Sequence, residues 1–176
     1  EIINQSMVDM SITVEAGDIF VIAQKIVSKS EGRLVNLTQV EPSARALELA
    51  QATEKDPRFI ELVLRESNAV LRTRPGTIIV EHKNGFVCAN AGIDHSNVQG
   101  LWGNPEDWVL LLPEDANQSA ERIRARLIAL SGIESLGVLV IDSHGRAWRN
   151  GTVGVAIGVA GVPALVDMRG QPDLFG

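Results

Sequence analysis

The sequence predicts an α+β fold in which a mixed β-sheet is flanked by helices. Aliphatic runs typical of buried strands are interspersed with stretches of helical periodicity. The two kinds of element do not alternate strictly, and one pair of strands reads as a hairpin, which a purely parallel sheet would not contain. The 176 residues are 45% hydrophobic and 22% charged, which is ordinary for a globular domain. We expect a single domain over residues 1–176.

The first third of the chain predicts three helices and one strand. Apolar residues at helical spacing predict a helix over Ile2–Met10, and Gly17 then acts as a break. The run Ile19–Ala23 predicts a fully buried strand. A second helix is expected over Pro42–Ala52, with the proline in its first turn. A third begins at Asp56-Pro57, an N-cap followed by proline at the first helical position.

The rest of the chain predicts a hairpin, three further strands and one helix. Asn84-Gly85 separates two strand-like runs and is a favoured hairpin turn. An apolar stripe over 117–130 predicts the helix, and the interpretation of its arginines, Arg122, Arg124 and Arg126, is a solvated face. The expected strands are Thr77–Glu81, Phe86–Ala89, Val109–Leu112, Val138–Ile141 and Val153–Ala160.

Charge and cysteine content exclude several classes of protein. Sixteen basic against 22 acidic residues give a formal charge of −6, which argues against holding a nucleic-acid backbone through a broad basic surface. The acidic composition does not exclude a single localised binding site for a small anion. The single cysteine, Cys88, forms no internal disulfide and is interpreted as a core residue. No apolar run approaches the ~20 residues of a membrane span and the start lacks signal-peptide features, so we expect a cytoplasmic protein.

Three polar clusters follow apolar strands, where binding loops are commonly placed. The first, residues 24–33, has lysines and serines that could cradle phosphate, although it lacks the glycines of a Walker loop and also reads as a plain surface loop. The second, residues 90–97, contains Asp94, a candidate Mg²⁺ or Mn²⁺ ligand, but its composition also suits an Asx turn. The role of His95 in it is open.

The third cluster, residues 141–152, has Asp142 and Ser143 at a predicted strand end. A carboxylate beside a hydroxyl can hold a metal ion against a nucleotide, although the same residues suit a turn. Arg146 and Arg149 could meet a phosphate or a substrate carboxylate. Two separated acids with lysines and arginines are the inventory for metal-dependent handling of a nucleoside triphosphate.

Four stretches carry a family resemblance: Val21–Arg33, Ala89–Val98, Leu111–Asp115 with Ser119-Ala120, and Asp142–Gly161. They resemble the coenzyme F420:glutamate ligases, also called gamma-glutamyl ligases of the deazaflavin coenzyme. The run Ala-Gly-Ile-Asp-x-Ser-Asn, residues 91–97, is specific to that family. The resemblance implies the family's fold, an intertwined homodimer at full length, and a chain shortened at both ends relative to other members.

The resemblance also implies an activity: GTP-dependent addition of L-glutamate to a carboxylate of the deazaflavin precursor, with Mg²⁺ or Mn²⁺ and a monovalent cation such as K⁺. An acyl phosphate would be the intermediate, so no protein nucleophile is needed. The family's metal positions fall on Asp94, Asp142 and Ser143, the first two also being catalytic candidates. Its nucleotide contacts fall on Gln24, Lys25, Lys29 and Asn97. Our own inference adds Arg146 as a third catalytic candidate.

Two other functions stay open from the sequence. The first is a ligase that adds glutamate or another amino acid to a different carboxylate-bearing cofactor. The second is a nucleotide-binding relative without catalysis of its own.

Overall fold

The computed structural model describes residues 2–95, 98, 100–144, 150–151 and 153–172, and it confirms the α+β class. None of the helices it describes is long and apolar enough to cross a membrane. The elements in chain order are α1 (Ile2–Asp9), β1 (Ile19–Ala23), α2 (Gln24–Ser30), β2 (Leu34–Asn36), η1 (Leu37–Gln39), α3 (Ala44–Thr53), α4 (Pro57–Arg65), β3 (Ser67–Arg74), β4 (Thr77–His82), β5 (Val87–Ala89), η2 (Asn90–Gly92), η3 (Pro105–Asp107), β6 (Trp108–Leu110), α5 (Ala116–Ser131), β7 (Gly137–His144) and β8 (Val153–Ala160).

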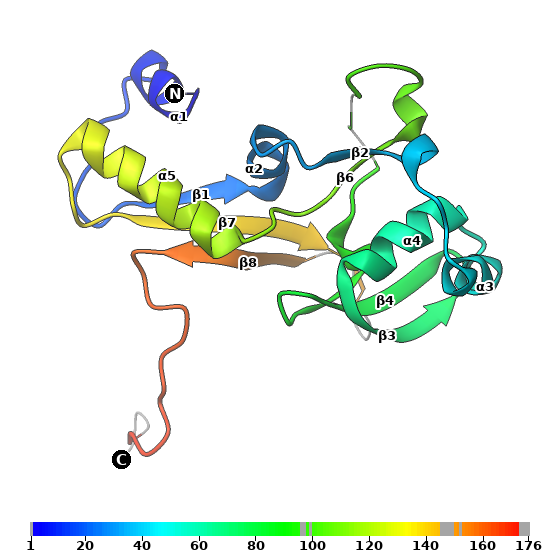
Figure 1. Ribbon diagram of the computed structural model, residues 1–176. Helices are drawn as coiled ribbons and strands as arrows, with labels where there is room; N and C mark the ends of the chain where they lie inside the picture. The colour runs from blue at the N-terminus through cyan, green and yellow to red at the C-terminus, as the bar shows by residue number, and fades with distance from the viewer. Residues whose placement is uncertain (1, 96–97, 99, 145–149, 152, 173–176) are drawn as a thin grey trace.

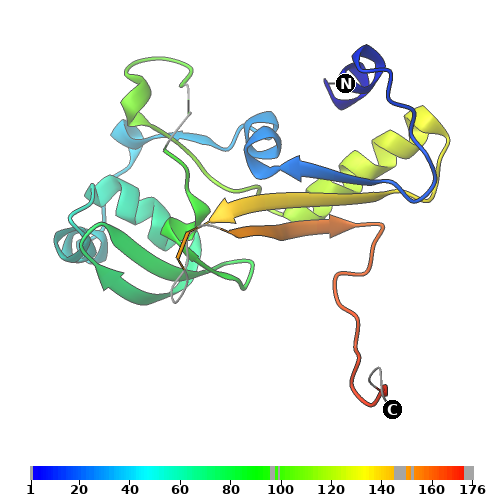
Figure 2. The ribbon, with the colours of Figure 1, turned by 180° about the vertical axis from the view of Figure 1, so that it is seen from behind.

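The described strands form three sheets, where we had expected one. In the first sheet β7 is central, parallel to β1 and antiparallel to β8. The second is the antiparallel sheet β3-β4-β5, and the third is the pair β2-β6. Figure 1 shows the two three-stranded sheets in separate lobes, with α5 along one and α3 and α4 beside the other. Seen from behind in Figure 2, β2 and β6 run between the two lobes.

Each lobe has its own apolar core. In the first lobe, Ala120 and Leu127 of α5 pack with Val138 and Val140 of β7. In the second, α3, α4 and β4 supply most of the buried side chains, among them the fully enclosed Ile60. A fully buried aliphatic side chain contributes about 1.5–3 kcal/mol, so these contacts provide the main stabilisation of each lobe.

Local sequence signals account for most element ends. Asp56 caps α4 by accepting the Arg58 N–H, and Pro57 follows it, as predicted. The hairpin β4-β5 forms around the predicted turn, where Gly85 adopts φ = +85°. Helix α3 begins later than expected, because Ser43 is its N-cap and Pro42 lies before it. Strand β8 has the predicted bounds.

Strand β1 is not fully buried, contrary to the prediction. Val21 is 57% exposed and Ile19 is 51% exposed, whereas Ile22 is buried. The reason is that β1 is an edge strand of a sheet that α5 covers on one face only, so alternate side chains meet the core.

Residues 24–30 form helix α2, where the sequence suggested a loop. Gln24, Val27 and Ser28 are its buried residues, and their spacing places them on one helix face. Two strands, β2 and β3, were missed because their side chains are largely polar or lie at a sheet edge. Strand β7 continues through Asp142 and Ser143, which were expected after its end.

Cys88 is a core residue, as predicted, and its chemistry follows from its position. It is fully buried in β5 opposite Val80, and burial, with a smaller contribution from the charge of Asp142, raises the pKa of its thiol to about 12. At about pH 8 only about one thiol in ten thousand would be ionised. We therefore expect a thiol reagent to leave the native protein unlabelled and to label one thiol after unfolding in guanidinium chloride. Rapid labelling of the native protein would contradict this burial.

Candidate functional site

Asp94 is held by two side chains from the first turn of α2. The Gln24 amide Nε2 donates to Asp94 Oδ2 at 2.6 Å, and Lys25 Nζ lies 3.3 Å from Asp94 Oδ1. The Asp94 backbone is also fixed, because its N–H and C=O both pair with Leu110 of β6. Both carboxylate oxygens therefore face donors. The side chain of Asp94 contacts α2, and its backbone pairs with β6.

The chain enters Asp94 through an unusual turn. Asn90, Ala91 and Gly92 have φ values of +55°, +54° and +67°, so three successive residues are left-handed. For a residue with a side chain this conformation costs about 1–2 kcal/mol. At Gly92 a side chain would also meet Leu112, whose Cδ1 lies 2.6 Å from the position of a Cβ atom. This explains why the family-specific run needs glycine two residues before Asp94.

Asp142 lies on β7 and is 9% exposed. One of its oxygens accepts the Ser143 N–H at 2.8 Å. Its negative charge contributes to the raised pKa values of both Asp94 and Cys88. The structure thus brings Gln24 and Lys25 into contact with Asp94, and the charge of Asp142 acts on the same carboxylate.

The electrostatics of Asp94 reflect opposing neighbours. Burial raises its pKa most, and the charge of Asp142 raises it further, while Lys25 and the hydrogen bond from Gln24 lower it. The net direction is upward, because the burial of the carboxylate outweighs the effects of the ammonium and the amide. The site therefore favours an added positive charge.

The donor set fits a hard divalent cation. Carboxylate and hydroxyl oxygens are the ligands that Mg²⁺ and Mn²⁺ prefer. The described residues contain no group of three or more acids, histidines or cysteines that could hold a metal ion. Asp94 and Asp142 would therefore supply two ligands, and the others would be hydroxyl, phosphate or water oxygens. In this structure the Lys25 ammonium provides the positive charge beside Asp94.

The remaining candidates fall in different places. Lys29 lies one helical turn after Lys25, so both belong to the same face of α2. Ser143 is exposed, and strand alternation directs its side chain away from the face of Asp142, so its part in a metal site stays a prediction. Asn97, Arg146 and Arg149 lie outside the described residues. His95 Nε2 lies 2.7 Å from the Glu106 carbonyl oxygen, a contact that links the segment after Asp94 to η3.

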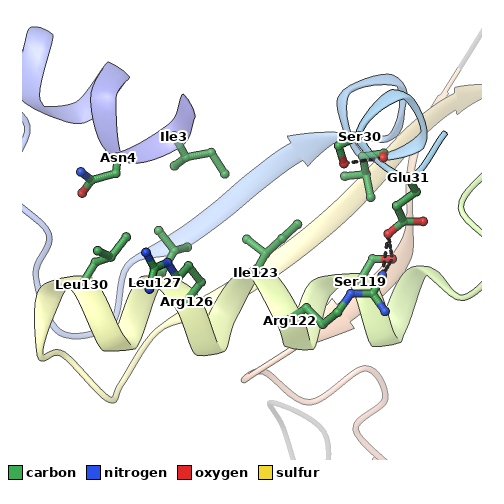
Figure 3. Close-up of a pocket in the computed structure, with 11 residues that line it drawn as sticks. Ile3, Asn4, Ser30, Glu31, Ser119, Arg122, Ile123, Arg126, Leu127 and Leu130 are labelled. Atoms are coloured by element: carbon green, nitrogen blue, oxygen red, sulfur yellow. Dashed lines mark hydrogen bonds and ion pairs between the residues drawn. The ribbon is translucent and has the colours of Figure 1, made fainter. Parts of the chain in front are cut away.

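The arginines of α5 are not simply a solvated face. Arg122 donates to Glu31 at 2.6 Å, and Glu31 also accepts from Ser119 (Figure 3). Arg124 donates to the carbonyl oxygens of Glu134 and Leu136. The solvated interpretation holds for Arg126, which lines a pocket of about 350 Å³ between α1, α2 and α5.

The contacts of Glu31 fasten the end of α2 to α5. Glu31 is the C-cap that directly follows α2, and its partners Ser119 and Arg122 lie on α5. This role of Glu31 was not predicted from the sequence, and neither was that of Ser28, whose hydroxyl donates to Gln24 within α2. Both roles depend on residues 24–30 being helical. The four-residue spacing of Gln24 and Ser28 was the sequence signal that could have predicted their hydrogen bond.

The chain matches known proteins over its whole length. The model of the family described as F420-0:gamma-glutamyl ligase matches residues 1–176. The coenzyme F420:L-glutamate ligase of Methanopyrus kandleri is 48% identical over 166 residues, which are 94% of this chain and 63% of that protein. The protein of the same name from Methanocaldococcus jannaschii is 42% identical over 176 residues, 100% of this chain and 68% of that protein. A third, from Methanothermobacter thermautotrophicus, is 46% identical over 160 residues, 91% and 61% of the two chains.

The chain thus spans somewhat under two thirds of two of these relatives and 68% of the other.

The placement of Asp94 predicts how its pKa responds to its neighbours. Lys25→Met removes the cation beside Oδ1 and should raise the pKa of Asp94, whereas Asp142→Asn removes a negative charge and should lower it. We expect shifts of about one unit in these opposite directions, measured by ¹³C NMR titration of the carboxyl carbon. Exposed Asp167, paired with Arg169, should not respond and serves as the internal reference. Shifts of the same sign would contradict the arrangement.

Proposed function

The chain belongs to the F420-0:gamma-glutamyl ligase family, and from this premise we propose that it joins L-glutamate to a carboxylate of the deazaflavin coenzyme F420 precursor. In this proposal GTP drives the reaction and Mg²⁺ or Mn²⁺ is required. The relatives that match the chain are named coenzyme F420:L-glutamate ligases, which supports the substrates. The observation that carries the proposal is the contact of Gln24 and Lys25 with Asp94, in a site where the charge of Asp142 is also felt.

The chemistry needs an activated carboxylate, because a carboxylate ion is a poor acylating agent. A precursor carboxylate oxygen attacks the γ-phosphorus of GTP, the bond from that phosphorus to the bridging oxygen breaks, and GDP leaves with the electron pair. The amine of L-glutamate then attacks the acyl carbon of the acyl phosphate. The carbon–oxygen bond to phosphate breaks, phosphate leaves, and the nitrogen loses a proton to give the amide.

The protein's contribution to this chemistry is charge and position. Lys25 and Lys29 on one face of α2 would bind phosphate oxygens, and the Gln24 amide would donate beside them. Asp94, Asp142 and Ser143 would hold the metal ion, whose positive charge allows two anions to approach. In the same proposal Asn97 contacts the nucleotide and Arg146 contacts a phosphate or a substrate carboxylate.

The proposal extends to the setting of the enzyme. We place the full-length protein in the cytoplasm as a homodimer, and we include a monovalent cation such as K⁺ among its requirements. Ile19 and Val21 of the edge strand β1 are exposed apolar residues, which agrees with burial of this edge in the proposed assembly.

A direct assay tests the proposed activity. Purified full-length protein is mixed with GTP, Mn²⁺, K⁺, L-glutamate and the deazaflavin precursor. The mass of the product is then measured by mass spectrometry. We expect the mass of the precursor to increase by one or more glutamate residues and GDP to appear. GTP binding without any product would instead indicate a non-catalytic relative, and glutamate addition only to another cofactor would indicate a different acceptor.

Asp94→Asn and Asp142→Asn should each lower the rate of ligation by about a hundredfold or more, because each removes a charged metal ligand. Both substitutions keep the side-chain shape, so we expect the circular dichroism spectrum to stay unchanged. The control is Asp167→Asn, at an exposed position remote from the cluster. Wild-type rates in either site variant would show that the metal assignment is wrong.

Lys29→Ala should weaken GTP binding by about tenfold, because it removes one charged hydrogen-bond donor to phosphate. Isothermal titration calorimetry measures the affinity. The matched control is Lys83→Ala, which removes an exposed ammonium that pairs with Glu66 on the other lobe. Equal GTP affinity for the two variants would refute the role of Lys29.

A further inference from the structure

Ser28 is linked to Asp94 through Gln24, which lies one helical turn before it in α2. Its side chain is completely buried, and its Oγ donates to Gln24 Oε1 at 3.0 Å. Gln24 is also buried, with 2% exposure, and its Nε2 donates to Asp94 at 2.6 Å. The three residues form one directed chain of hydrogen bonds, from Ser28 through Gln24 to Asp94.

We propose that Ser28 is a positioning residue: its hydroxyl orients the Gln24 amide so that the amide nitrogen faces Asp94 and the site. The metal-binding part of this inference rests on the proposed function. The hydrogen-bond chain itself does not rest on the proposed function, because the structure describes all three of its residues.

The orientation of the amide follows from the chemistry of the groups. An ionised carboxylate can only accept hydrogen bonds, and an amide NH₂ group can only donate them. The nitrogen of Gln24 must therefore face Asp94, and its oxygen must face the other way. That oxygen is enclosed within the fold and needs a donor, because a buried acceptor without one costs about 1–3 kcal/mol. Ser28 lies one helical turn later in α2, where an i,i+4 neighbour can reach it.

This arrangement sets what Gln24 can do. Its oxygen is engaged by Ser28, so Gln24 offers its N–H group to Asp94 and does not offer an oxygen ligand to a metal ion. Without the hydroxyl the amide can rotate, and an oxygen turned toward Asp94 would meet a second acceptor. Asp94 would then lose the N–H that Gln24 donates and keep its contact with Lys25.

The first measurement concerns the metal-free protein. In full-length protein labelled with ¹⁵N, the Gln24 side-chain amide protons should be protected from exchange with water. We expect Ser28→Ala to accelerate their exchange at least about tenfold. Ser131→Ala is the matched control, since this serine is also helical and donates to a residue four positions earlier, but at the far end of α5. Unchanged Gln24 protection in Ser28→Ala would overturn the proposal.

The second measurement is a double-mutant cycle on Mn²⁺ affinity, followed by titration calorimetry. Loss of a residue that orients a metal site typically costs 10–100-fold in affinity, so Ser28→Ala should raise the Mn²⁺ Kd by about tenfold or more. In a Gln24→Ala background the same substitution should change the Kd less than about twofold, because Ser28 acts through Gln24. An equal loss in both backgrounds would show that Ser28 acts otherwise, and would overturn the proposal.

Two further controls keep the outcomes distinct. Thermal unfolding reports whether Ser28→Ala still folds, and if it does not, Ser28→Cys keeps a side-chain donor, weaker than the hydroxyl, and should lie between wild type and Ser28→Ala. If the wild-type protein binds no Mn²⁺, the metal part of the proposed function fails, and the exchange measurement alone decides the role of Ser28.

Discussion

The arrangement depends on two carboxylates that share a partly buried junction between the lobes. Asp94 and Asp142 come from different elements, and the charge of Asp142 disfavours the charged form of Asp94. Lys25 and Gln24 offset this repulsion by supplying an ammonium and an amide to Asp94. Because these two groups occupy the first turn of α2, the position of one short helix determines whether the pair of acids can be maintained.

Helix α2 is accordingly fastened at both ends. Its first turn bonds to Asp94, and Glu31 at its end accepts from Ser119 and Arg122 of α5. The segment that follows reaches the second lobe, where Arg33 donates to Glu66 at 3.1 Å and to the Leu112 carbonyl oxygen at 2.8 Å. The left-handed turn before Asp94 is a local cost of about 1–2 kcal/mol per non-glycine residue, and these surrounding contacts offset it.

Local signals could predict the elements that local interactions determine. The Asp56 cap, the Asn84-Gly85 hairpin and the bounds of β8 all follow from short stretches of sequence. The exposure of β1 could not be predicted, because it depends on α5 covering only one face of the sheet. The cluster itself joins Gln24 to a residue 70 positions away, so composition and spacing could nominate its members but could not bring them together. The family resemblance nominated the residues as a prediction, and the structure showed the contacts of Gln24, Lys25 and Asp94.

The contact between Lys25 and Asp94 affects how a metal ion could bind at this site. Lys25 Nζ lies 3.3 Å from Asp94 Oδ1, so a divalent cation that uses this oxygen must compete with an ammonium already beside it. An ammonium that leaves Asp94 stays on the first turn of α2, on the face that also includes Lys29. A nucleotide phosphate at that face would compensate the displaced charge. In the proposed reaction, charge balance would therefore link the binding of metal and nucleotide, because one lysine neutralises either the aspartate or the phosphate, but not both fully at once.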